Sequence, residues 1–233
     1  MYCCIKERMG SVLMWDSQEN LSEFDKFLIK TNKIGAKSLD ELFRKERMIT
    51  NKKALELGKN PIKGNFDYQH LKDIHKALFE DVYTWAGQDR MQMGLKEKFA
   101  KYAPNGAIIN FVPGKELDKY SKIIFDELAK NNYLKNSKDL NHFAKNLAKF
   151  MGEINALHPF REGNGRTQRI FLNELAKNAG YKLDLNLISK HKMIHACVEA
   201  SQLKPGRLEA LIKDNLKNFR QNLDLEQNKG MSL

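Results

Sequence analysis

One short stretch of the sequence, His158–Arg169, carries most of the residues that could do chemistry: His-Pro-Phe-Arg-Glu-Gly-Asn-Gly-Arg-Thr-Gln-Arg. It combines an imidazole that can act as a base, one carboxylate, a Gly-Asn-Gly turn and two arginines. Glycines let backbone N–H groups converge on an anion, and the start of a following helix adds the positive end of its dipole. A carboxylate beside such a cradle suits Mg²⁺, which binds one or two carboxylates together with phosphate oxygens. These residues predict a site for a magnesium-bound polyphosphate, with a candidate base at its edge.

The same stretch resembles the signature of the Fic family, His-Pro-Phe-x-(Asp/Glu)-Gly-Asn-Gly-Arg-x-x-Arg, with every specified position filled. A motif of this length is far more specific than an isolated Gly-x-Gly. Most Fic proteins are protein adenylyltransferases, so the resemblance implies transfer of AMP from Mg²⁺-ATP to a Ser, Thr or Tyr hydroxyl of a target protein, with release of pyrophosphate. Two alternatives stay open: another Fic-type transfer, such as phosphorylation or removal of AMP, and a catalytically silent module that only senses ATP.

The resemblance also assigns roles to individual residues. His158 is expected to be the general base that takes the proton of the target hydroxyl, and Glu162 is expected to bind the magnesium ion. The predicted nucleotide-binding residues are Gly163, Asn164, Gly165, Arg166, Arg169 and Lys96. The simpler alternatives are a His158 that only caps a helix and a Glu162 that only offsets a helix dipole.

The helix after the motif is expected to run from near Asn164 to Gly180, where a glycine is a good C-terminal stop. Arg166 and Arg169 are three residues apart, so both should project from one side of this helix toward its start. That arrangement suits two neighbouring phosphates, because a guanidinium can bind phosphate oxygens in a bidentate manner. The side chain of Asn164 is expected to add a further donor to the anion site.

Hydrophobic residues recur at helical spacing along most of the chain, so we expect an all-α fold of about seven or eight helices. The clearest stripes are Leu71–Val82, Leu117–Leu128, Phe143–Leu157 and Leu208–Phe219. Ser38–Glu41 has the pattern of a capping box at a helix start, and Asp67 has that of a simple N-cap. These stripes are interpreted as core packing rather than as a cofactor site.

The helical period is lost between Trp85 and Pro113, a segment interrupted by Gly94 and Gly106. In the Fic family, a β-hairpin flap over the active site lies in this region, so the resemblance implies one here. Lys96 falls near the position of the family's flap lysine, although its neighbours differ from the usual glycines. Such a hairpin would dock the target by strand addition, which uses backbone more than side chains.

The composition places the chain among ordinary globular proteins. Its 233 residues can form one sizeable domain, and no apolar run is long enough to span a membrane, so no membrane contact is expected. The net charge of +11 comes from lysines scattered over the predicted helices, so nucleic-acid binding is not expected as the main role. Three cysteines without metal-ligand spacing predict neither a disulfide framework nor a zinc site. The N-terminus has no signal-peptide pattern, so a cytoplasmic location is expected, with signal-less export as an effector left open.

Three segments are expected along the chain: a helical N-terminal extension (1–60), the Fic domain (61–220) and a tail (221–233) that is frayed or regulatory. Fic proteins often carry an inhibitory (Ser/Thr)-x-x-x-Glu-(Gly/Asn) helix, either in the chain or on a small antitoxin. The nearest match here, Asn222–Gln227, departs from it at two of three specified positions. Inhibition by the tail, inhibition by a separate antitoxin and absence of inhibition all stay open. The expected partner in catalysis is a target protein with an accessible hydroxyl.

Overall fold

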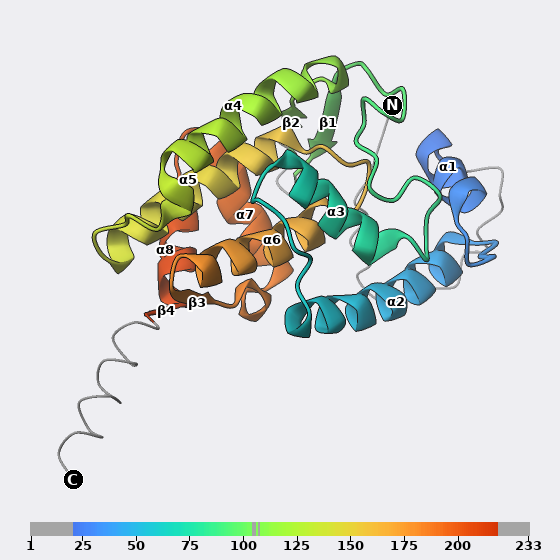
Figure 1. Ribbon diagram of the computed structural model, residues 1–233. Coiled ribbons are helices and arrows are strands. Elements are labelled where there is room, and N and C mark those ends of the chain that lie inside the picture. The colour runs from blue at the N-terminus through green and yellow to red at the C-terminus, as the bar shows by residue number, and fades with distance from the viewer. Residues whose placement is uncertain (1–20, 104–105, 107, 219–233) are drawn as a thin grey trace, which may run out of the picture.

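The protein is known from a computed structural model, which describes residues 21–103, 106 and 108–218 (Figure 1). The α-helices are α1 (Glu23–Thr31), α2 (Leu39–Lys59), α3 (Tyr68–Phe79), α4 (Leu117–Lys130), α5 (Leu140–Leu157), α6 (Asn164–Asn178), α7 (Lys190–Ser201) and α8 (Gly206–Asp214). The antiparallel strand pairs are β1 (Phe99–Tyr102) with β2 (Ile108–Phe111), and β3 (Tyr181–Leu183) with β4 (Leu216–Asn218). Short 3₁₀ helices are η2 (Gly114–Glu116), η3 (Asn132–Leu134) and η4 (Leu185–Leu187). The expected all-α fold with a small hairpin is confirmed, and the pair β3–β4 is an addition to it.

Side chains at the helix starts explain where several helices begin. Asp67 accepts a hydrogen bond from the backbone N–H three residues on, at 2.7 Å, and caps α3 as the sequence predicts. Ser38 caps α2, but the carboxylate of Glu41 bonds the N–H of Lys37, so the predicted capping box is only half formed. A complete capping box opens α1 at Ser22 instead.

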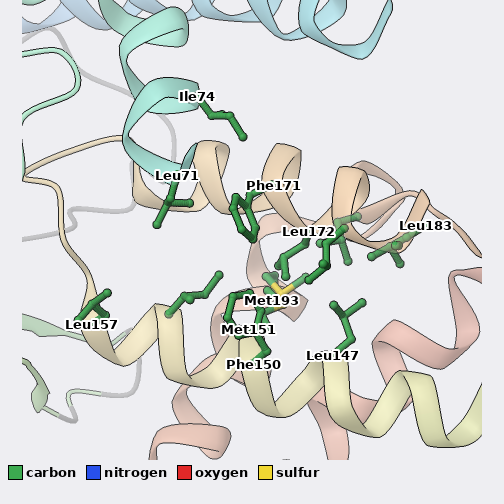
Figure 2. Packing of buried hydrophobic residues seen from close by; sticks show 14 of the residues in the cluster. Leu71, Ile74, Leu147, Phe150, Met151, Leu157, Phe171, Leu172, Leu183 and Met193 are labelled. Atoms are coloured by element: carbon green, nitrogen blue, oxygen red, sulfur yellow. The ribbon is translucent and has the colours of Figure 1, made fainter. Parts of the chain in front are cut away.

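Helix α6 lies in the middle of the bundle and contacts α3, α5 and β3 (Figure 1). Figure 2 shows side chains of α3, α5 and α6 meeting in the core, among them Leu71, Phe150 and Phe171. Leu71 and Phe171 are fully buried. Each such side chain contributes roughly 1.5–3 kcal/mol relative to an exposed one. The packing therefore fixes the axis of α6, and with it the position of the motif at its N-terminus.

The β1–β2 hairpin, called the flap below, lies against the end of α5 that leads into the motif. Its register pairs Phe99 with Phe111, which sets both rings at the base of the hairpin. The N–H of Val112 donates to the carbonyl of Ala156 in α5 at 3.0 Å. Gly114 follows closely, and a Cβ there would lie 1.9 Å from a backbone carbonyl oxygen, so only glycine allows this approach. The flap is thereby fixed at its base.

One expectation ends differently in the structure. The stripe Leu208–Phe219 is helical only as far as Asp214, because Leu216 pairs in the β3–β4 ladder instead. No helix among the described residues is both long enough and apolar enough to cross a membrane. Residues 1–20 and 219–233 lie outside the described part, and with them two of the three cysteines and the predicted regulatory tail.

Candidate active site

His158 caps the C-terminal end of α5, directly after Leu157, with a left-handed backbone, φ 43° and ψ 58°. Few residues other than glycine adopt this conformation, and such strain is common where a side chain must be aimed at a site. The conformation turns the imidazole out of the helix and against the flap, where it stacks on Phe111 at a centroid distance of 3.9 Å. Phe99 approaches the same ring at 5.8 Å. Two aromatic rings of the flap thus enclose the candidate base.

Enclosure keeps His158 neutral. Burial lowers the pKa of its imidazole well below the usual value, and the positive charges of Lys101 and Arg90 lower that pKa further. Neither ring nitrogen has full hydrogen-bond geometry to another described residue, although the nearby backbone of Asn155 offsets a part of the lowering of the pKa. A neutral imidazole with a free lone pair can accept a proton, so the site meets the first requirement of a general base.

A buried arginine holds the backbone around His158. The Arg90 side chain is 1% exposed and donates to three carbonyls: His158 at 2.9 Å, Leu157 at 3.1 Å and Val112 at 2.6 Å. These carbonyls belong to the end of α5 and to the end of the flap. Burial lowers the pKa of Arg90 to about 10, so the group stays charged near neutral pH. Arg90 therefore joins the candidate base to the flap that covers it.

The backbone of Glu162 is anchored by a second buried histidine. His75, in α3, accepts a hydrogen bond from the N–H of Gly87 at Nδ1, which leaves its proton on Nε2. That Nε2–H donates to the carbonyl of Glu162 at 3.1 Å, and the ring stacks on Phe160 at 3.9 Å. Burial lowers the pKa of His75 to about 3, so it remains a neutral donor. His75, which the sequence analysis does not single out, therefore positions the motif.

The Glu162 carboxylate itself is ionised and 32% exposed. Burial opposes its ionisation, but the charge of Lys101, a hydrogen bond from the Gly163 N–H at 3.0 Å and the charge of Arg166 together lower its pKa. A single ionised carboxylate beside a phosphate cradle fits Mg²⁺, which completes its shell with phosphate oxygens and water. The donor at this position therefore suits the expected metal.

The glycines of the motif make room for a backbone turn and for an anion. Gly163 has φ +84°, and a Cβ there would lie 2.4 Å from the ring of Phe79, so this position requires glycine. Gly165 faces open space, with nothing within 4 Å of an added Cβ. Asn164 is 3% exposed, and its amide bonds both the N–H and the carbonyl of Phe160. Its side chain thus braces the turn, whereas it was expected to contribute a donor to the anion.

The two arginines lean toward different neighbours. Arg166 reaches α2, where its Nη1 lies 2.5 Å from Glu46 Oε1 and donates to Thr50 Oγ1 at 3.2 Å. Arg169 is half-buried beside Cys197 of α7 and makes no hydrogen bond or ion pair within the described part of the chain. Burial lowers the pKa of Arg169, with a smaller effect of Arg166 in the same direction. Arg166 thus has its partners on α2, and Arg169 lies near α7, while their charges still act on each other.

The flap contributes a lysine that the sequence did not single out. Lys101, in β1, lowers the pKa of both His158 and Glu162 by its charge. Lys96 lies before β1 with an exposed side chain, while its carbonyl accepts the N–H of Lys115 at 2.9 Å. Of the two lysines, Lys101 is therefore the one whose charge acts on the candidate base and the candidate metal ligand.

Comparison with known proteins identifies this arrangement. A family model described as the Fic/DOC family matches residues 65–176. The N-terminal Fic domain of a VirB-translocated Bep effector protein from Bartonella quintana, solved with bound ADP, is 31% identical. The match covers 82% of this chain and 92% of that chain, with a TM-score of 0.73. The chain belongs to the Fic/DOC family.

Other Fic relatives point the same way. The protein adenylyltransferase VbhT of Bartonella schoenbuchensis is 37% identical over 203 residues, which are 86% of this chain and 40% of VbhT. The chain thus spans well under half the length of that relative. The structure of BepC from Bartonella tribocorum, solved with bound AMPPNP, is 29% identical with a TM-score of 0.69, covering 80% of this chain and 91% of that one.

A cavity of about 210 Å³ lies between the flap and α7. Its lining residues are Ile108, Ile109, Asn110, Val198, Ser201 and Gln202. Val198 lies on α7 directly after Cys197, and Cys197 is the neighbour of Arg169. Helix α7 therefore contributes residues both to the cavity and to the surroundings of Arg169. Apolar side chains and amides line the same small volume, a mixture that suits a flat heterocycle with polar edges.

Proposed function

We propose that this Fic domain transfers AMP from ATP to a hydroxyl of a target protein. The observation that carries the proposal is His158, a buried and neutral imidazole that stacks on Phe111 of the flap and lies four residues before the ionised Glu162 at the start of α6. A protein that only sensed ATP would have no use for an enclosed base at this point. The names of the relatives, protein adenylyltransferase among them, support the same reaction class.

The transfer begins with the target hydroxyl close to His158, at the edge of the flap. Its oxygen attacks the α-phosphorus of ATP while its proton passes to an imidazole nitrogen, which burial keeps unprotonated. The bond between the α-phosphorus and the bridging oxygen breaks, and pyrophosphate leaves with the electron pair. The products are the AMP-modified protein, pyrophosphate and the proton held on His158. Exposed backbone of β1 would align the target segment by strand addition.

Motif residues would bind the nucleotide around this reaction centre. Glu162 would hold Mg²⁺, which neutralises phosphate charge and orients the leaving group when bound. The backbone N–H group of Gly165, together with the N-terminal end of α6, would face the same anion, whereas the Gly163 N–H donates to the Glu162 carboxylate. Arg166 and Arg169 would bind the β- and γ-phosphates from two sides. We assign to Lys101 the flap-lysine role that the sequence analysis gave to Lys96.

The base of the nucleotide would occupy the cavity between β2 and α7. Its isoleucine and valine side chains can cover the faces of a purine, and the amides of Asn110 and Gln202 can bond its edge. This location would place the purine between strand β2 of the flap and α7. The remaining proposals concern location and partners. The protein is cytoplasmic before any export, and its activity is inhibited by its tail, by a small antitoxin or by neither.

The deciding experiment uses ATP labelled at either the α- or the γ-phosphorus, with Mg²⁺ and a lysate that contains candidate targets. Label on protein from the α-position alone is the expected result. Label from the γ-position would establish phosphorylation instead. Binding of ATP with no label from either position would leave the silent sensing module as the function.

A further inference from the structure

Glu46 lies on α2, outside residues 65–176 that the family model matches, yet it contacts the motif. Its side chain is 5% exposed, and Oε1 lies 2.5 Å from Nη1 of Arg166. Thr50, one helical turn later on α2, accepts from the same Nη1 at 3.2 Å. Two side chains of the N-terminal extension therefore converge on one nitrogen of a motif arginine.

The second oxygen of Glu46 is also engaged, because the hydroxyl of Tyr83 donates to Oε2. Burial, reinforced by the charge of Glu46, raises the pKa of Tyr83, so that hydroxyl remains a proton donor. Burying a carboxylate is costly, and a buried ion pair is by itself weak evidence of a contribution to stability. A carboxylate whose two oxygens are both hydrogen-bonded has a fixed orientation, however, and it therefore also fixes the orientation of the arginine that it binds.

The other contacts of the Arg166 guanidinium show how this orientation affects the site. One face of the guanidinium lies over the ring of Phe79 at 4.7 Å. Nη2 points to the Glu162 side of the site, 3.8 Å from Oε1. A guanidinium is planar, so contacts at one face and one nitrogen fix the position of all its N–H groups. Glu46 occupies the Nη1 edge, and the edge toward Glu162 stays directed at the phosphate cradle.

We infer that Glu46 is a positioning residue for nucleotide binding: it orients Arg166 so that the other guanidinium edge meets the outer phosphates of ATP. The inference rests on the proposed function, since it assumes that ATP binds at the motif. It makes part of α2 a functional component of the catalytic domain. In the opposite role, Glu46 would hold Arg166 away from the phosphates. Replacing Glu46 would then strengthen ATP binding instead of weakening it, so measured affinities distinguish the two roles.

The test compares Mg²⁺-ATP and AMP binding by calorimetry in the full chain, for the wild type and for Glu46→Gln. AMP lacks the phosphates that Arg166 would bind. ATP affinity should fall about ten-fold, in line with the loss of one charge-assisted contact, while AMP affinity stays within about two-fold. Glu56→Gln is the matched control, because Glu56 is an exposed carboxylate on the same helix and should leave both affinities unchanged.

Thr50→Val provides a second variant in case Glu46→Gln does not fold, because it removes only the hydroxyl that accepts from Arg166. It should weaken ATP binding several-fold and leave AMP binding intact. Unchanged ATP affinity in both variants overturns the assignment, as does an equal loss for ATP and AMP with a lowered melting temperature. Tighter ATP binding in Glu46→Gln shows that Glu46 withholds the arginine. Failure of the wild type to bind ATP overturns the proposed function itself.

Discussion

The chemistry of His158 depends on where its ring is held rather than on its residue type alone. His142 and His191 lie on exposed helix surfaces and face water, and the buried His75 has both ring nitrogens hydrogen-bonded. His158 is turned out of α5 by a left-handed backbone and enclosed by Phe111 and Phe99. Burial then selects the neutral imidazole, because the charged form would lose its hydration.

Replacing His158 with alanine should abolish transfer but leave ATP binding nearly intact, since the base acts on the target hydroxyl and not on the nucleotide. Loss of a general base typically costs 10²–10⁴-fold in rate. Labelling of the target with α-labelled ATP measures the transfer, and calorimetry measures the binding. His142→Ala, at an exposed site on the same helix, is the control and should retain full activity. Equal labelling by His158→Ala and the wild type would rule out the assigned base.

At the scale of helices and strands, the sequence predicts what depends on local spacing. The hydrophobic period and the Asp67 cap locate α3, and Gly180 marks the end of α6. The loss of period after Trp85 correctly indicates the flap. Spacing cannot predict which flap residue faces the site, because that depends on strand register. Phe99 and Lys101 are two residues apart on β1 and so share the face toward the motif.

Lys101→Ala should therefore weaken Mg²⁺-ATP binding by several-fold, because it removes a positive charge that acts on Glu162 and on the space beside it. Lys96→Ala is the matched control: it removes the same charge from an exposed position before β1 and should change the affinity by less than about two-fold. Titration calorimetry at two salt concentrations gives both the affinity and its electrostatic part. A larger loss of ATP affinity in Lys96→Ala than in Lys101→Ala would assign the flap-lysine role to Lys96, as the sequence indicates.

At the scale of the whole molecule, the motif is one short segment of the sequence, but residues that hold it in place come from distant segments. The contact between His75 and Glu162 joins residues 87 positions apart, and that between Thr50 and Arg166 joins residues 116 apart. No periodicity or motif spacing predicts such pairs, because they arise only when α2 and α3 pack against α6. The same packing gives Arg166 partners on α2 and places Arg169 near Cys197 of α7. A catalytic unit cut at residue 61 would therefore lose two of the groups that hold Arg166.

Buried neutral histidines also make the stability of the whole fold depend on pH. His75 is 0% exposed, and burial lowers its pKa to about 3, whereas an unfolded histidine titrates near pH 6.5. Between these values the unfolded chain binds a proton that the folded protein does not, so stability must fall as the pH decreases below about 6.5. One such group contributes a slope of about 1.4 kcal/mol per pH unit. The buried carboxyl of Glu174, whose pKa is raised to about 7, acts in the opposite direction.

These opposing contributions are separated by comparing the wild type with His75→Gln, whose amide oxygen and nitrogen can replace the two hydrogen bonds of the ring but cannot take up the proton. Urea unfolding at several pH values between 7.5 and 5 gives the free energy of unfolding of each protein. The difference between them should change by about 1.4 kcal/mol per pH unit below pH 6.5, with the wild type losing more stability. His142→Gln, at an exposed site, should run parallel to the wild type. Parallel curves for His75→Gln and the wild type would mean that the anchor of the Glu162 loop is charged in the folded protein, and the neutral donor assigned to it would be wrong.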